Sequence, residues 1–89
     1  MEARNVPIQV IAHWDAAGGI RPLRFRYEDS RRGSCTVHVQ EVSDVRRVAC
    51  AELEALMFLC KSKEADGERM YELKYAVGTQ IWTLFRRIY

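Results

Sequence analysis

The sequence predicts a mainly β protein, a small six-stranded antiparallel barrel or roll in a single domain covering residues 1–89. Two observations predict it. Apolar and polar residues alternate with a period of two along most of the chain, as they do in strands with one buried face. Short segments rich in glycine and aspartate interrupt this alternation at intervals that suit hairpin turns.

Three strands are expected in the first half of the chain, over residues 8–14, 20–29 and 35–42. The segments DAAGG and DSRRGS supply the turns between them. Pairing Phe25 with both Val10 and Val39 keeps the apolar side chains on one face and places Arg26 opposite His38. Because a shift of one residue would turn every apolar side chain to the wrong face, the agreement across three strands supports this meander.

Three further strands are expected in the second half, within the segments LMFLC, RMYELKYA and IWTLF. The Asp66-Gly67 dipeptide predicts the centre of a type I′ turn, which would pair Phe58 with Tyr75. A second tight turn at Gly78 would pair Tyr75 with Trp82. The three strands then share one apolar face, made of Leu56, Phe58, Cys60, Leu73, Tyr75, Trp82 and Leu84.

The segment between the two meanders is ambiguous. Ser43 is a suitable helix cap, and Val45, Val48 and Leu53 fall at helical spacing. We therefore expect residues 43–55 to form either a short helix or an irregular loop. A single flat sheet would leave one apolar face in water, so the two meanders should close on each other as an SH3-like barrel or compact roll.

The composition is that of an ordinary globular chain, with 48% hydrophobic residues, 29% charged residues and a formal net charge of +2. No apolar run approaches the ~20 residues that a membrane helix needs. The first residues also lack the sustained apolar stretch of a secretory signal. We therefore expect a cytoplasmic protein that makes no membrane contact.

The three cysteines, Cys35, Cys50 and Cys60, form no closely spaced pair. This odd number argues against a disulfide framework and fits a reducing compartment. Only two histidines accompany them, and the spacing does not suggest a zinc site. Cys35 and Cys60 are expected to be small buried hydrophobic residues, and no metal or cofactor is expected.

Sequence signatures of an enzyme are missing. Gly18-Gly19 lies between two expected strands rather than before a helix, so it does not resemble a phosphate-binding loop. Cys35 and His38 should point to opposite faces of one strand, which would separate a nucleophile from its base. We therefore expect a binding module without catalytic activity.

The first candidate site is a row of cations on the outer face of the second and third strands. Arg24, Arg26 and His38 should share this face, with Arg21 at the end of the strand and Arg31 and Arg32 in the adjoining turn. Small barrels bind single-stranded nucleic acid through such a basic surface, together with exposed aromatic residues. Alternatively, the nearby Glu28, Glu41 and Asp44 could neutralise the row through cross-strand ion pairs.

The second candidate site is apolar and consists of Met57, Leu59, Met70 and Phe85. These residues alternate with the predicted core residues, so they should lie on the opposite face of their strands. Contiguous exposed apolar residues mark interfaces. Our main hypothesis is accordingly a surface for a protein partner or for a second copy of the chain as a homodimer. Nucleic acid on the arginine-bearing face is the alternative.

Several segments resemble a family of short uncharacterised bacterial all-β proteins. They are VIAHWDAAGGIRPLRFRYED, VQEVSDVRR, the strand with Phe58 and Cys60, the segment YELKY and the strand with Trp82. The resemblance implies a small all-β domain and supplies no catalytic residues. The segments RPLRFRYED and VQEV are also similar, more faintly, to a β domain encoded beside translesion polymerases, which favours nucleic acid slightly. The segment ACAELEA departs from the shorter, glycine-rich connector of the family.

Overall fold

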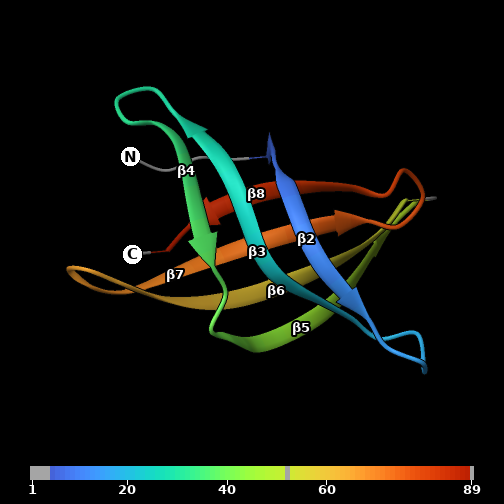
Figure 1. The fold of residues 1–89 in the computed structure, drawn as a ribbon. Helices are drawn as coiled ribbons and strands as arrows, with labels where there is room; N and C mark the ends of the chain where they lie inside the picture. Colours follow the sequence, from blue (N-terminus) through green and yellow to red (C-terminus); the bar gives the residue numbers. More distant parts are fainter. Residues whose placement is uncertain (1–4, 52, 89) are drawn as a thin grey trace.

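The computed structural model describes residues 5–51 and 53–88, and in this part of the chain every regular element is a β-strand. The antiparallel strands form two sheets that face each other (Figure 1). The larger sheet has the order β1-β8-β7-β6-β5, and the smaller sheet has the order β2-β3-β4. The strands are β1 (Val6–Pro7), β2 (Gln9–Trp14), β3 (Ile20–Asp29), β4 (Gly33–His38), β5 (Glu41–Cys50), β6 (Leu53–Glu64), β7 (Gly67–Ala76) and β8 (Ile81–Arg87). The predicted antiparallel β architecture is confirmed.

The described part of the chain has two strands more than the predicted six, and these lie largely outside the segments that were expected to be strands. β1 precedes the first expected strand, and most of β5 lies in the segment 43–55. The chain passes from β1 to β2 at Ile8, where the Ile8 amide donates a hydrogen bond to the Trp82 carbonyl at 3.1 Å. It passes from β4 to β5 near Gln40, whose amide donates to the Lys61 carbonyl at 2.8 Å. The predicted number of strands is therefore wrong, and the described strands do not close into a barrel but form two sheets joined at corners.

The segment 43–55 is neither a helix nor a loop, contrary to our expectation. It contributes most of β5 and the first residues of β6, while residue 52 lies outside the described residues. The register shifts between Val42 and Asp44, so that Val42 lies opposite Cys60 and Val45 lies opposite Phe58. This bulge adds one residue to β5 and spaces two inward-facing valines three positions apart. The helical spacing of Val45 and Val48 has no such origin, because these two residues follow the bulge and lie on opposite faces of β5.

The β6–β7 hairpin pairs in a register two residues away from the predicted one. Phe58 lies opposite Leu73 rather than Tyr75. The turn residues are Ala65 and Asp66, and Gly67 follows them as the first paired residue of β7, with a φ of 127°. Because a shift by two residues keeps every side chain on its face, the predicted core face of this hairpin is unaffected.

The β3–β4 hairpin shows the same kind of shift. Phe25 lies opposite Val37 instead of Val39, whereas its predicted pairing with Val10 in β2 is confirmed. The pairing of Tyr75 with Trp82 between β7 and β8 is also confirmed. The alternation thus predicted the inward faces on both sides of each turn, and only the length of the turn was misjudged.

The hydrophobic core lies between the two sheets and draws on both. Phe25 from the smaller sheet meets Tyr71 of the larger sheet edge-to-face, with 5.3 Å between the ring centroids. Tyr75 and Trp82 lie 4.9 Å apart in the same layer. Burial of each large apolar side chain stabilises the fold by roughly 1.5–3 kcal/mol. The fully or nearly buried cluster comprises Phe25, Tyr27, Val37, Val39, Phe58, Cys60, Tyr71, Leu73, Tyr75, Trp82 and Leu84.

Candidate binding surface

The smaller sheet has one face against the core and one face in solvent. Along β3, Phe25 and Tyr27 point inward and are buried, while Arg24 and Arg26 are exposed. This separation follows from the strand itself, because successive side chains point to opposite faces. The outer face of β2–β3–β4 is therefore the place where the arginine side chains gather.

A bulge brings Arg21 onto the same face as Arg24. In the β2–β3 pairing, Ile11 lies opposite Arg24 but the next residue, Ala12, lies opposite Pro22. Leu23 is thus the extra residue of β3, and it is exposed. Without this bulge, the odd spacing between Arg21 and Arg24 would place them on opposite faces. We define the arginine face by Arg21, Arg24, Arg26 and His38.

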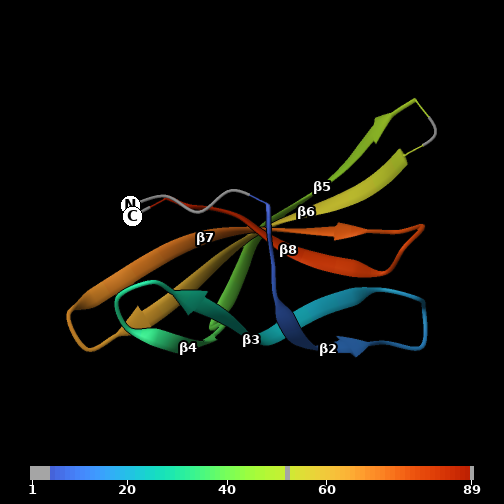
Figure 2. The ribbon, with the colours of Figure 1, turned by 90° about the horizontal axis from the view of Figure 1, so that it is seen from above.

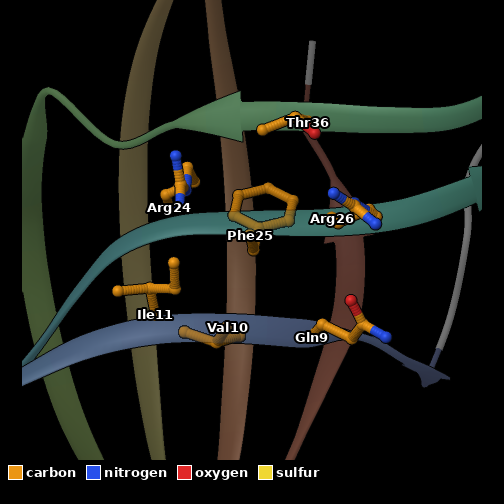
Figure 3. A pocket seen from close by; sticks show the side chains of 7 residues that line it. All are labelled: Gln9, Val10, Ile11, Arg24, Phe25, Arg26 and Thr36. Atoms are coloured by element: carbon orange, nitrogen blue, oxygen red, sulfur yellow. The ribbon is translucent and has the colours of Figure 1, made fainter.

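A shallow groove of about 200 Å³ runs across this face. Figure 3 shows the side chains of Arg24 and Arg26 on β3, flanked by β2 and by Thr36 of β4. In the register, Arg26 lies between Gln9 and Thr36. Amide, hydroxyl and guanidinium groups therefore line a surface that can donate several hydrogen bonds to a ligand with acceptor oxygens.

Two positions before Arg26 on β3, Arg24 lies between Ile11 of β2 and His38 of β4. This differs from the predicted register, in which His38 faced Arg26. The Arg21 side chain lies further along β3, where its Nη2 donates to the Gln40 carbonyl oxygen at 3.4 Å. Arg21 is thus directed to the corner between β4 and β5, at one end of the arginine face.

The arginine face keeps its positive charge. Within residues 5–51 and 53–88, the ion pairs involve neither Arg24 nor Arg26. Glu41, which could have neutralised them, instead lies 3.6 Å from the Lys61 ammonium on the larger sheet. Residues two positions apart on a strand are separated by about 6.6 Å, so Arg24 and Arg26 place two guanidiniums side by side.

Arg31 and Arg32 are not brought together with the other arginines. They lie in the turn between β3 and β4, and Glu28 lies on β3 between this turn and Arg26. The Asp29 carboxylate accepts hydrogen bonds from the backbone amides of Arg31 at 2.7 Å and Arg32 at 3.0 Å. These two hydrogen bonds lower the pKa of Asp29. Asp29 thus holds the turn in place through hydrogen bonds. Arg31 and Arg32 lie at the end of the smaller sheet, apart from the arginine face.

The environment of Arg32 also differs from that of the arginine face. The side chain lies beside Cys35 and Tyr27, and the charges that these groups take on when deprotonated, together with Asp29, raise the pKa of Arg32. Burial is the main cause that raises the pKa of the Tyr27 hydroxyl, followed by Cys35. Cys35 is half-buried rather than fully buried, and Cys60 is fully buried. The expectation of a buried cysteine thus holds fully only for Cys60.

The chain itself covers much of the predicted apolar surface. Met57 and Met70 are only 6% and 8% exposed, and Leu59 and Phe85 are half-buried. In the register, Met57 lies opposite Arg46 of β5, whose aliphatic stem can cover apolar surface while its guanidinium stays in water. These four residues therefore do not form a bare apolar face.

Apolar exposure instead occurs at the far end of the β5–β6 hairpin. Val45, Val48 and Leu53 are exposed there. Their exposure on a strand was not predicted, because residues 43–55 were expected to form a helix or a loop. The signal that could have revealed them is the run of valines at 42, 45 and 48, since β-branched residues favour strands.

Comparison with protein-family models, with curated proteins and with solved structures found no match for this chain. Across the described ranges, no group of three or more histidine, cysteine, aspartate or glutamate side chains is placed to hold a metal ion. The same residues include no helix with the length and apolarity to cross a membrane. The geometry of the fold and of its surfaces is therefore the basis for the functional argument.

Proposed function

We propose that the protein is a binding module without catalytic activity, and that its arginine face holds an acidic surface of a protein partner. The observation that carries this proposal is the pair of exposed guanidiniums of Arg24 and Arg26, which have no ion pair among the described residues. The planar fork of arginine suits bidentate contact with carboxylates. Because β3 is paired on both sides, its backbone is already ordered before a partner binds.

A protein partner is favoured over nucleic acid by what accompanies the arginines. Ile11 and Leu23 are exposed on or beside the arginine face, and mixed apolar and arginine contacts are typical of protein interfaces. Single-stranded nucleic acid needs exposed aromatic rings for stacking. The candidate nearby is Trp14, which is 56% exposed but meets Tyr75 of the larger sheet, with ring centroids 6.5 Å apart.

The absence of catalysis is part of the proposal, and one feature of β4 supports it. Cys35 lies opposite Tyr27, which points into the core, whereas His38 lies opposite the exposed Arg24. A cysteine and a histidine on opposite faces of one strand cannot form a nucleophile and base pair.

The two corners at Ile8 and Gln40 support a further proposal, that the architecture is an open variant of the SH3-like roll. Each corner lets one continuous segment pair with both sheets, as strands do in small barrels. Membership of the family of short bacterial β proteins that the sequence resembles also stays a proposal.

The test compares a labelled polyglutamate peptide with a labelled single-stranded oligonucleotide by fluorescence anisotropy. The wild type should bind the peptide, and the double change Arg24→Glu/Arg26→Glu should weaken this binding at least about tenfold, since two exposed charge contacts contribute roughly 1 kcal/mol each at most and reversal adds repulsion. The double change Arg31→Glu/Arg32→Glu is the matched control, because it alters the net charge equally at the end of the sheet.

Three results would contradict the proposal. Equal loss in both double variants would show that net charge alone attracts the peptide. Binding of the oligonucleotide but not the peptide, with an affinity that falls steeply with salt, would favour nucleic acid. Binding of neither probe by the wild type would remove the arginine face as a site for acidic ligands.

A further inference from the structure

Strand β5 forms an open edge of the larger sheet. It pairs with β6 on one side, and no strand of the described residues pairs with it on the other. Figure 2 shows that the β5–β6 hairpin extends away from the ends of the other hairpins. The unpaired amide and carbonyl groups of such an edge are a template for a further strand. At the opposite edge of the sheet, β1 consists only of Val6–Pro7, so β5 offers the long template.

The exposed end of this hairpin is apolar on both of its faces. Val45 lies opposite the buried Phe58 and yet is 51% exposed. Val48 lies opposite Ala55, on the other face, and is also exposed. The partners of these valines in β6, Phe58 and Ala55, are themselves paired with β7, so the valines lie on the outer strand of the sheet. An additional strand along β5 would shield these valines.

The charges on β5 do not prevent such pairing, because its arginines are held by carboxylates of their own sheet. The Arg46 Nη2 donates to Glu72 Oε2 at 3.0 Å. Arg47 forms an ion pair with Glu54 of β6. The carboxylate of Asp44 has no ion pair within the described ranges. The side chains of Arg46 and Arg47 nevertheless stay 57% and 71% exposed, so a strand that approached this edge would meet one free carboxylate and two guanidiniums that can make a further contact.

The sequence of β5 is complementary to itself in one antiparallel register. Two copies can pair antiparallel around a twofold axis perpendicular to the sheet. Residues that lie opposite each other then point to the same face of the sheet. This condition holds only when one residue of β5 lies on the axis, opposite the same residue of the second copy. With Val45 in this position, Asp44 lies opposite Arg46 of the second copy, and this contact occurs twice. Opposite charges in directly opposed positions stabilise strand pairing.

The registers centred on the neighbouring charged residues or on Val48 lack this complementarity. Placing Arg46 or Arg47 on the axis would oppose two guanidiniums, and placing Asp44 there would oppose two carboxylates, both of which are unfavourable. Placing Val48 on the axis would set Arg46 opposite Cys50 and form no ion pair. With Val45 on the axis, the bulge at Ser43 falls opposite Arg47 of the second copy, so regular pairing is limited to residues 44–46 of each copy, at the short end of strand lengths.

We propose that two copies of this chain associate through their β5 edges, antiparallel and centred on Val45, so that the larger sheets become continuous across a twofold axis. Asp44 of each copy then pairs with Arg46 of the other. Because the paired segment is short, the interface is small, and the dimer should be weak, with a Kd on the order of 10 µM to 1 mM. This inference does not rest on the arginine face, which lies on the other sheet.

The test uses two variants with opposite changes of charge. Asp44→Arg places arginine opposite arginine in a homodimer, and Arg46→Asp places aspartate opposite aspartate. Each variant alone should therefore sediment as a monomer at concentrations at which the wild type dimerises. An equimolar mixture should recover the dimer, because the guanidinium introduced at position 44 of one variant then lies opposite the carboxylate introduced at position 46 of the other, and the unchanged Arg46 lies opposite the unchanged Asp44.

Matched controls carry the same changes of charge at exposed positions away from β5. Glu68→Arg corresponds to Asp44→Arg, and Arg24→Asp corresponds to Arg46→Asp. Both control variants should remain dimeric. Arg24→Asp also separates the two proposals, because it should weaken the binding of the acidic peptide and leave dimerisation intact.

Arg46→Asp removes a partner of Glu72, so circular dichroism must show that this variant is folded. If it is not, Val45→Lys replaces it, since two lysines opposite each other on the axis should also give a monomer. The proposal is overturned if the wild type is entirely monomeric at ~1 mM, where about half of the chains should be dimeric even at the upper limit of the expected Kd. It is also overturned if Asp44→Arg remains dimeric, or if the mixture of two folded variants stays monomeric.

Discussion

Replacing Glu72 with glutamine tests whether one carboxylate ties three strands of the larger sheet together. The Glu72 side chain in β7 is only 6% exposed. Its Oε2 accepts a hydrogen bond from Arg46 of β5 at 3.0 Å, and its Oε1 accepts one from Arg86 of β8 at 2.9 Å. The carboxylate therefore joins two strands that do not pair with each other and satisfies its own buried charge.

The expected loss of stability follows from these two contacts. A hydrogen bond to a charged group contributes about 1.5–3 kcal/mol, which sets an upper bound of about 6 kcal/mol for the two. The side chains of Arg46 and Arg86 are 57% and 48% exposed, so they recover water when the contact is lost. Glutamine also keeps one acceptor oxygen. We therefore expect Glu72→Gln to lower the free energy of unfolding by about 2 kcal/mol, which corresponds to a fall in Tm of roughly 8–16 °C.

Urea denaturation followed by circular dichroism measures this change, and the m-value should stay constant if only the native state is affected. Glu41→Gln is the control, because it removes the carboxylate of an exposed pair whose Glu41 and Lys61 atoms lie 3.6 Å apart. The control should change the free energy of unfolding by less than about 0.5 kcal/mol. The reasoning is refuted if Glu72→Gln has no larger effect than this control.

Two further predictions concern the β6–β7 turn and a buried thiol. Gly67 has a φ of 127° and open space around its α-carbon, so Gly67→Ala should cost roughly 1–3 kcal/mol through backbone strain alone. Gly78→Ala, where φ is not positive and space is also open, should be nearly neutral; equal urea midpoints for the two variants would contradict this. Burial raises the pKa of the Cys60 thiol to about 12, an effect that Arg21 opposes only in part. The native state then keeps a proton that the unfolded chain, with a thiol pKa near 9.0, releases. This contribution to stability is complete below pH 9 and is lost as the pH rises towards 12, by up to about 4 kcal/mol. Cys60→Val should flatten this alkaline loss in urea titrations, and an unchanged slope would count against the assignment; burial also raises the pKa of Tyr71, so part of the slope should persist.

The inward and outward faces of the strands could be predicted from the sequence, whereas the registers of the β3–β4 and β6–β7 hairpins could not. Alternation places Phe25 and Tyr27 inside for any even shift of the strand, so burial was predicted correctly while the pairing was displaced by two residues. Only the turn decides between even shifts. In the β6–β7 hairpin, Gly67 follows the two turn residues instead of occupying their centre.

The exact positions of the bulges could not be deduced from alternation. Ser43 has no neighbouring glycine or proline, whereas Leu23 follows Pro22, a residue that strands tolerate mainly at edges and bulges. The first bulge brings Arg21 to the arginine face, and the second places Val42 and Val45 on one face of β5 although they are three positions apart. Both bulges are defined by how β3 pairs with β2 and how β5 pairs with β6, which the alternation within one strand does not contain.

The burial of Met57 and Met70 was missed for a related reason. Their position on the outer face of the larger sheet could be deduced from alternation. Their neighbours on that face could not, because these depend on the pairing that sets Arg46 of β5 opposite Met57. A residue such as Arg46 is solvent-exposed in any local analysis, and it becomes part of the cover only when β5 is placed beside β6.

The two proposed surfaces are compatible because they lie on different sheets. Pairing through β5 leaves β2–β3–β4 unobstructed, so a dimer would carry two arginine faces related by the twofold axis. An acidic partner that reached both faces would bind the second one intramolecularly, and its avidity would exceed the affinity of a single face. The monomeric Val45→Lys variant should then keep the affinity for a short acidic peptide and lose the added affinity for a long one. The Arg24→Glu/Arg26→Glu variant should lose both, so the contribution of each surface can be measured separately.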